Sequence, residues 1–128
     1  IYKRIKNLAP ERSDEVVKLL QMHGGCSAGT KFANVDPRGN VHPCQFWQDY
    51  KVGNVKETPF SQIWNSDDPL MVMLRNKSDH LKGRCGKCAF NYLCGGCRIR
   101  ARAAYGDVWA EDPACYLSDD EIREGMVS

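Results

Sequence analysis

The spacing of apolar residues near the start of the chain predicts a helix. The apolar positions form a stripe among charged and polar neighbours: Val16, Val17, Leu19 and Leu20. This spacing is typical of one face of a helix. Pro10 suits a first helical turn, and Gly24-Gly25 would end the helix. We therefore expect a helix from Pro10 to about Met22.

A β-hairpin is predicted over residues 32–46. Two short runs, Phe32–Val35 and Asn40–Cys44, flank the turn Asp36-Pro37-Arg38-Gly39. Pro at the second position and Gly at the fourth suit a type I turn that closes with a left-handed residue. The hairpin would let Cys26 and Cys44 approach one centre.

Two helix starts follow the hairpin. Thr58 is expected to cap a helix whose first residue is Pro59 and which continues through Phe60–Trp64. The segment Ser66-Asp67-Asp68-Pro69 should begin another helix, with an apolar side made of Leu70, Met73 and Leu74.

The last third of the chain predicts two more helices. A basic, alanine-rich helix should run from Arg98 to about Tyr105 and end at Gly106. Ser118 and Glu121 have the spacing of a capping box for a short terminal helix. Short helices around one or two hairpins indicate a small, irregular α+β fold.

Composition limits the class of protein. The length of 128 residues fits one domain, and 42% apolar residues allow only a small core. The longest apolar runs are too short for a membrane helix. No signal peptide is visible, and the first residue is not Met, so we expect a piece of a larger cytoplasmic protein.

The cysteines carry the clearest chemical signal. They form the pattern C-x12-G-x4-C, then C-x2-C-x5-C-x2-C, then a single C: Cys26, Cys44, Cys85, Cys88, Cys94, Cys97 and Cys115. Each C-x2-C is a tight knuckle that can point two sulfurs at one metal. One four-coordinate site would leave three cysteines over, so two metal centres with one ligand missing fit the count better.

Iron–sulfur clusters fit the spacing better than zinc. Zinc ribbons separate their two C-x2-C pairs by roughly 15–20 residues, whereas five separate them here. Cluster cores accept ligands from closely spaced loops, although the ferredoxin run C-x2-C-x2-C-x3-C-P is absent. A zinc-stabilised interaction module remains the alternative. Disulfides are disfavoured by the odd cysteine count.

The sequence does not identify the eighth ligand that two four-ligand centres would need. His23 lies three positions before Cys26 in a glycine-rich loop, and Asp36, Asp79 and Asp112 are possible oxygen ligands. An iron open to substrate or to a small exogenous thiol is an equal alternative. His42 and His80 are interpreted as satisfied or surface residues, and the three tryptophans as packing residues.

Charge does not indicate a nucleic-acid partner. The formal net charge is +2 with neutral thiols, and seven thiolates on two cationic cluster cores would remove that excess. The basic residues gather around the cysteines: Lys82, Arg84, Lys87, Arg98, Arg100 and Arg102. They could form a solvated face, compensate anionic clusters, or contact a polycarboxylate substrate.

The cysteine string closely resembles the SPASM domain, the auxiliary-cluster extension that follows the barrel of many radical S-adenosylmethionine enzymes. Further matches are Gly39–Cys44, Val52–Val55 and Pro59–Trp64. The resemblance covers about residues 24–117. Two residues separate Cys94 from Cys97, which is a variant of the three that are usual in the family. It implies two [4Fe–4S] clusters and an N-terminal helical segment, residues 1–23, that leads to a barrel outside this chain. Residues 118–128 would form a tail with a short helix.

Some phrases resemble a narrower group within the family. These are Leu81–Cys85, Leu93–Arg98 and Ala110–Leu117, which look like the radical enzymes of the siroheme-dependent haem and haem d1 pathways. Those enzymes remove propionate or acetate side chains from an iron tetrapyrrole. Peptide-modifying and sulfatase-maturing relatives share the cysteine frame, so a peptide- or protein-modifying enzyme is the alternative.

The resemblance also implies a division of the ligands. The first cluster would be held by Cys26, Cys44 and Cys97, with its fourth ligand unassigned. The second would be held by Cys85, Cys88, Cys94 and Cys115. The radical-generating motif C-x3-C-x2-C does not occur in these residues, so the chain alone is expected to lack catalysis. It would act with the barrel, a tetrapyrrole substrate and an external electron carrier, and with no nucleic acid or membrane.

Overall fold

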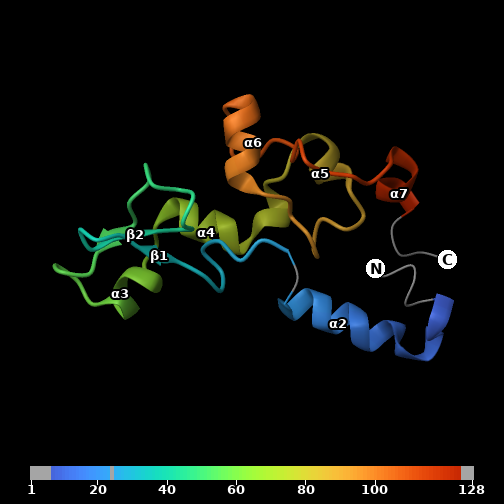
Figure 1. Cartoon of the computed structure of the whole chain (residues 1–128), viewed down its shortest axis with the longest axis horizontal. Helices are drawn as coiled ribbons and strands as arrows, with labels where there is room; N and C mark the ends of the chain where they lie inside the picture. The colour runs from blue at the N-terminus through green and yellow to red at the C-terminus, as the bar shows by residue number, and fades with distance from the viewer. Residues whose placement is uncertain (1–6, 24, 125–128) are drawn as a thin grey trace. The chain divides into compact units, whose positions relative to one another are not determined.

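A computed structural model of the chain describes residues 7–23 and 25–124 (Figure 1). The chain divides into two compact units. One is the continuous segment Ser27–Lys77, called the hairpin unit below. The other, called the knuckle unit, combines the flanking segments Ile1–Cys26 and Ser78–Ser128.

The hairpin unit contains an antiparallel sheet in the order β1-β2-β3. Strand β1 is Asn34–Val35, β2 is Asn40–His42 and β3 is Gly53–Asn54. Asn34 pairs with His42, and Val41 pairs with Gly53. The predicted hairpin is confirmed. Strand β3 was not predicted, because two residues are too few to show an alternating pattern.

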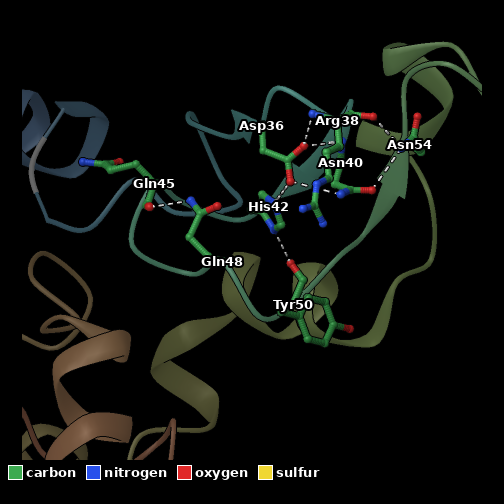
Figure 2. A network of polar contacts seen from close by, with 8 residues as sticks. All are labelled: Asp36, Arg38, Asn40, His42, Gln45, Gln48, Tyr50 and Asn54. Atoms are coloured by element: carbon green, nitrogen blue, oxygen red, sulfur yellow. Dashed lines mark hydrogen bonds and ion pairs between the residues drawn. The ribbon is translucent and has the colours of Figure 1, made fainter.

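The turn between β1 and β2 has the expected left-handed glycine. The Gly39 amide donates to the Asp36 carbonyl at 2.9 Å, and Gly39 has a φ of +91°. The Asn54 side chain donates to the Arg38 carbonyl at 3.2 Å and to Asn40 Oδ1 at 3.0 Å (Figure 2). The turn is thereby tied to β3.

Two helices complete the hairpin unit. Helix α3 is Phe60–Trp64, and its N-cap is Pro59 with no side-chain capping bond, so the expected Thr58 cap is wrong. Helix α4 is Pro69–Arg75, and Asp68 caps it by accepting from the Met71 amide at 3.0 Å. The Asp68 carboxylate is a better acceptor for the free amides of the first helical turn than the Thr58 hydroxyl.

The core of the hairpin unit forms where β2 and the helices bury their apolar side chains. Its most buried members are Val41, Trp47, Ile63, Met71 and Leu74. The packing role expected for Trp47 is confirmed, since only 2% of it is exposed. The expected apolar side of α4 is partly wrong, because Met71 is buried with Leu74 while Leu70 and Met73 are only half-buried.

The knuckle unit is made of short helices and loops. The 3₁₀ turn η1 (Pro10–Arg12) leads into α2 (Ser13–His23), which agrees with the predicted helix. The 3₁₀ turn η2 is Lys77–Asp79. Helix α5 (Gly83–Lys87) lies within the predicted cysteine loop and was not expected.

Two predicted helix ends of the knuckle unit are confirmed. Helix α6 is Arg98–Tyr105, and Gly106 ends it in the left-handed conformation with φ +70°. Helix α7 is Asp119–Glu124. Ser118 and Glu121 exchange reciprocal bonds at 2.9 and 3.2 Å, which is the predicted capping box.

The described residues therefore form a small α+β fold, as predicted. Within ranges 7–23 and 25–124, every helix is too short or too polar to cross a membrane.

Candidate metal centre

Four cysteines of the knuckle unit come from three neighbouring segments. Cys85 lies in α5, Cys88 caps the C-terminus of that helix, Cys94 begins the C-G-G-C loop, and Cys115 precedes α7. Helices α5 and α7 contact each other, and the Ala89 amide donates to the Ile122 carbonyl at 2.8 Å. No disulfide occurs among the described residues, and all seven cysteines are thiols.

The other three thiols are close enough to Cys88 to affect its ionisation. Burial raises the pKa of the Cys88 thiol, and the negative charges of Cys115, Cys85 and Cys94 raise it further. A hydrogen bond from the Phe90 amide partly opposes the rise. A cationic cluster core would offset the unfavourable ionisation of Cys88.

Backbone amides point at three of the sulfurs. Phe90 N lies 3.4 Å from Cys88 Sγ, Gly96 N lies 3.4 Å from Cys94 Sγ, and Asp112 N lies 3.3 Å from Cys85 Sγ. Thiolates that bind iron accept such bonds, and the bonds help to set cluster potentials. Thiol sulfurs that accept from backbone amides are the kind of donor that suits an iron–sulfur cluster.

Asp112 joins the cysteine segments to one another. Its Oδ2 accepts from the Cys97 amide at 2.8 Å, and its Oδ1 accepts from the Ala114 amide at 3.0 Å. Arg100 binds both carboxylate oxygens, at 3.0 and 2.7 Å. Burial alone would raise the pKa of Asp112, but the bonds from Arg100, Ala114 and Cys97 lower it to about 2. The carboxylate is therefore ionised, and its oxygens are engaged by protein donors.

Arg84 ties the loop that carries Cys115 to α5. Its guanidinium donates to the Leu117 carbonyl at 2.6 Å and to Asp119 Oδ1 at 3.0 Å. The bond with Asp119 raises the pKa of Arg84, and the Cys115 thiolate contributes in the same direction. A permanent positive charge therefore lies beside this thiol.

Cys26 lies in the same unit and is held near the C-G-G-C loop. Its amide donates to the Cys94 carbonyl at 3.3 Å. The Asp112 bond raises the pKa of Arg100, and the charges of Cys97 and Cys26 raise it further. Cys26 and Cys97 thus share one guanidinium as a neighbour.

Cys44 belongs to the hairpin unit and lies two residues after the end of β2. The Trp47 amide donates to the Cys44 carbonyl at 3.1 Å, and the Gly29 amide donates to the Pro43 carbonyl at 3.1 Å. These bonds define the path of the backbone on both sides of the thiol. The expected approach of Cys44 to Cys26 stays a prediction.

A buried histidine holds the hairpin that carries Cys44. His42 Nδ1 lies 2.7 Å from the Tyr50 carbonyl oxygen, and Nε2 lies 3.0 Å from Asp36 Oδ2 (Figure 2). Both ring nitrogens of His42 therefore have a hydrogen-bond partner. The bond to His42 lowers the pKa of Asp36 well below its ordinary value of 3.8. His42 is the satisfied core residue that was predicted.

The remaining ligand candidates are dispersed. The side chain of His23 lies outside the described residues. His80 packs against Trp109 with ring centroids 5.2 Å apart, and Asp36 is engaged by His42 and Asn40. Across the described part of the chain, no three His, Cys, Asp or Glu side chains meet closely enough to hold a single metal ion.

Sequence reasoning did not identify the roles of Asp112 and Arg98. Asp112 was considered only as a metal ligand, and Arg98 only as one of six basic residues near the cysteines. The proximity of Asp112 to Cys115 in the sequence was a weak signal. Its contacts with Cys85 and Cys97 span 27 and 15 residues, which no local pattern reveals.

Residues 26–89 match the family model of the SPASM iron–sulfur cluster-binding domain. This chain belongs to that family. The matched range includes four of the seven cysteines: Cys26, Cys44, Cys85 and Cys88. No solved structure matches the chain.

Curated relatives agree with this assignment. The chain is 51% identical to Pre-heme d1 synthase of Dinoroseobacter shibae over 81% of its length, covering 26% of that protein. It is 45% identical to Fe-coproporphyrin III synthase of Methanosarcina barkeri over 95% of its length, covering 32% of it. PqqA peptide cyclase of Gluconobacter oxydans is 37% identical over 77% of the chain, which covers 28% of that cyclase. The chain thus spans about a quarter to a third of these relatives.

Proposed function

We propose that this SPASM domain is the twin-cluster auxiliary part of a radical S-adenosylmethionine enzyme that modifies side chains of an iron tetrapyrrole in haem or haem d1 biosynthesis. The names of the two relatives with 51% and 45% identity support the pathway. The radical-generating barrel would precede this domain in the same polypeptide, and residues 1–23 would connect the two.

The observation that carries the proposal is the grouping of the thiols. Cys88 experiences the charges of Cys85, Cys94 and Cys115, and these four are the ligands proposed for the second cluster. Cys26 and Cys97 instead share Arg100, in agreement with a first cluster that they would hold together with Cys44. Each set would bind one [4Fe–4S] cluster, with the fourth ligand of the first cluster still to be assigned.

When bound, each cluster supplies a one-electron acceptor or donor, and the first could also supply an iron open to substrate. The protein's own residues position the sulfurs and set their surroundings. The amides of Phe90, Gly96 and Asp112 donate to sulfur and stabilise its negative charge. Electron transfer needs no side-chain acid or base. An external electron carrier would exchange electrons with the domain, and the whole enzyme would work in the cytoplasm.

Metal analysis of cysteine variants tests the cluster assignment. The full-length protein is purified anaerobically, and iron, acid-labile sulfide and zinc are measured. Cys88→Ala and Cys26→Ala should each remove the iron of one [4Fe–4S] centre, and the double variant should remove that of two. Ser78→Ala, an exposed substitution in the same unit, should remove none. A colourless protein with stoichiometric zinc would contradict the proposal, as would a single cysteine change that removes no iron.

A substrate assay tests the pathway. Consumption of S-adenosylmethionine coupled to removal of side-chain carbon from an iron tetrapyrrole is the expected result. The peptide cyclase relative makes a peptide-modifying enzyme the second candidate. Turnover of a peptide in place of the tetrapyrrole would favour that candidate while leaving the cluster assignment intact.

A further inference from the structure

Arg98 is the most deeply buried basic side chain whose burial is described near the cysteines. It is the first residue of α6, directly after Cys97, and only 1% of its surface is exposed. Arginine is seldom buried to this degree unless a negative charge accompanies it. Arg100, two residues further along the same helix, has a side chain that is 54% exposed and paired with Asp112.

No carboxylate among the described residues accepts a hydrogen bond from Arg98, and Asp107 interacts with it only through space. Nη1 donates to the carbonyls of Val108 and Ala110, at 2.9 and 2.7 Å. Nη2 lies 3.9 Å from Cys85 Sγ. Among the described residues, no acceptor lies within hydrogen-bond distance of the buried Nε. Two carbonyl bonds satisfy donors but supply no countercharge.

The chain holds space open for this guanidinium. A Cβ at Gly96 would lie 2.6 Å from Arg98 Nη2, so the glycine of the C-G-G-C loop allows the guanidinium to lie against the backbone. The two carbonyl bonds then fix its orientation, with Nη2 directed at Cys85. The charge is therefore held beside one particular sulfur of the proposed second cluster.

We propose that Arg98 is the buried countercharge of the second cluster and raises its reduction potential. This inference rests on the proposed function. A [4Fe–4S] core with four thiolates is anionic, and reduction adds one electron without forming or breaking a bond. A cation at the sulfur stabilises the reduced, more negative state more than the oxidised state, because attraction grows with charge in a poorly solvated site. The same anion offsets the cost of burying Arg98.

A redox titration of the full-length protein, monitored by electron paramagnetic resonance under anaerobic conditions, tests the inference. The signal absent from Cys88→Ala identifies the second cluster. In Arg98→Gln, we expect the ratio of reduced to oxidised second cluster at a given ambient potential to fall about tenfold, which is about 59 mV for a one-electron couple. The reduction potential of the first cluster should shift less. Arg123→Gln, which removes an exposed charge from α7, is the matched control and should shift neither.

A second variant separates charge from packing. Arg98→Lys keeps the positive charge but has no second terminal nitrogen to place beside Cys85 Sγ, so its reduction potential should stay closer to the native value than that of Arg98→Gln. Equal shifts in Arg98→Lys and Arg98→Gln, or no shift in Arg98→Gln, would overturn the inference. If Arg98→Gln fails to retain iron, the reduction potential of Arg98→Lys decides the test alone. A tenfold or larger fall in the ratio of reduced to oxidised second cluster in Arg98→Lys would then count against the inference. Absence of iron from the native protein would instead defeat the proposed function.

Discussion

At the scale of single residues, polar side-chain contacts fix the path of the local backbone. His42 and Asp36 illustrate this, since their contact closes the hairpin that carries Cys44. The Asp36 carboxylate also accepts from the Arg38 and Asn40 amides, at 2.8 and 3.0 Å. One carboxylate thus organises both the turn and the strand that follows it.

The lowered pKa of Asp36 predicts how the hairpin responds to acid. The folded pKa lies below the ordinary value of 3.8, so the contribution of Asp36 to stability is full above that pH and is lost as the pH falls through the folded pKa. Asp36→Asn should reduce amide protection of residues 34–42 at pH 7, and the difference from the native protein should narrow only below about pH 4.

Hydrogen exchange followed by mass spectrometry, with both proteins compared at each pH, measures this difference. Ser61→Ala, an exposed change on α3, provides a control in the same unit. A difference that vanishes already between pH 7 and 5 would show that another group is responsible.

At the scale of elements, the C-G-G-C loop leaves no room for a side chain at Gly96. Gly95 and Gly96 both have left-handed φ values, +66° and +57°. Arg98 Nη2 and Asp112 Cβ lie 2.6 and 2.9 Å from where a Gly96 Cβ would be. The loop leads directly into α6, so displacing it would move both Cys94 and Cys97.

Gly96→Ala should therefore reduce cluster content, while Gly106→Ala should not. Gly106 also has a positive φ, +70°, but a Cβ there meets nothing within 4 Å. Gly106→Ala carries only the left-handed backbone penalty of about 1–2 kcal/mol, whereas Gly96→Ala adds overlap with two buried neighbours. Iron content and denaturant unfolding, measured for both variants, check this. Equal iron loss in the two would mean that the backbone angle alone accounts for the effect.

At the scale of the whole molecule, the proposed ligand sets link segments far apart in the chain. Cys94 and Cys97 are separated by two glycines, yet the proposal assigns them to different clusters. Cys97 would share its cluster with Cys26 and Cys44, which lie 71 and 53 residues earlier in the chain.

Cys97→Ala should lower both iron content and resistance to unfolding. The first cluster would lose a protein ligand, and the segments it connects would be held by fewer bonds. Iron analysis and thermal unfolding, monitored together, test this. A stable, soluble variant with full iron would refute the assignment of Cys97.

The elements predicted correctly have local causes. Gly39 suits the left-handed end of its turn, Gly106 the end of α6, and Ser118 with Glu121 the start of α7. Each depends on residues within a few positions, so a single sequence is enough to predict it. Thr58 failed as a cap because Pro59 itself occupies the N-cap position.

The sequence by itself determined the thiol chemistry of this protein and its family. Its motifs are visible without coordinates: seven cysteines, glycines inside both C-x2-C knuckles, and the Gly53-Asn54 and Ile63-Trp64 pairs. The tertiary structure decided which polar groups lie next to the thiols and hold their segments together. Asp112 reaches Cys85 across 27 residues, and Arg98 reaches the Ala110 carbonyl across 12. Such partners depend on the path of the folded backbone, whereas knuckle spacing and helix caps depend on neighbours along the chain.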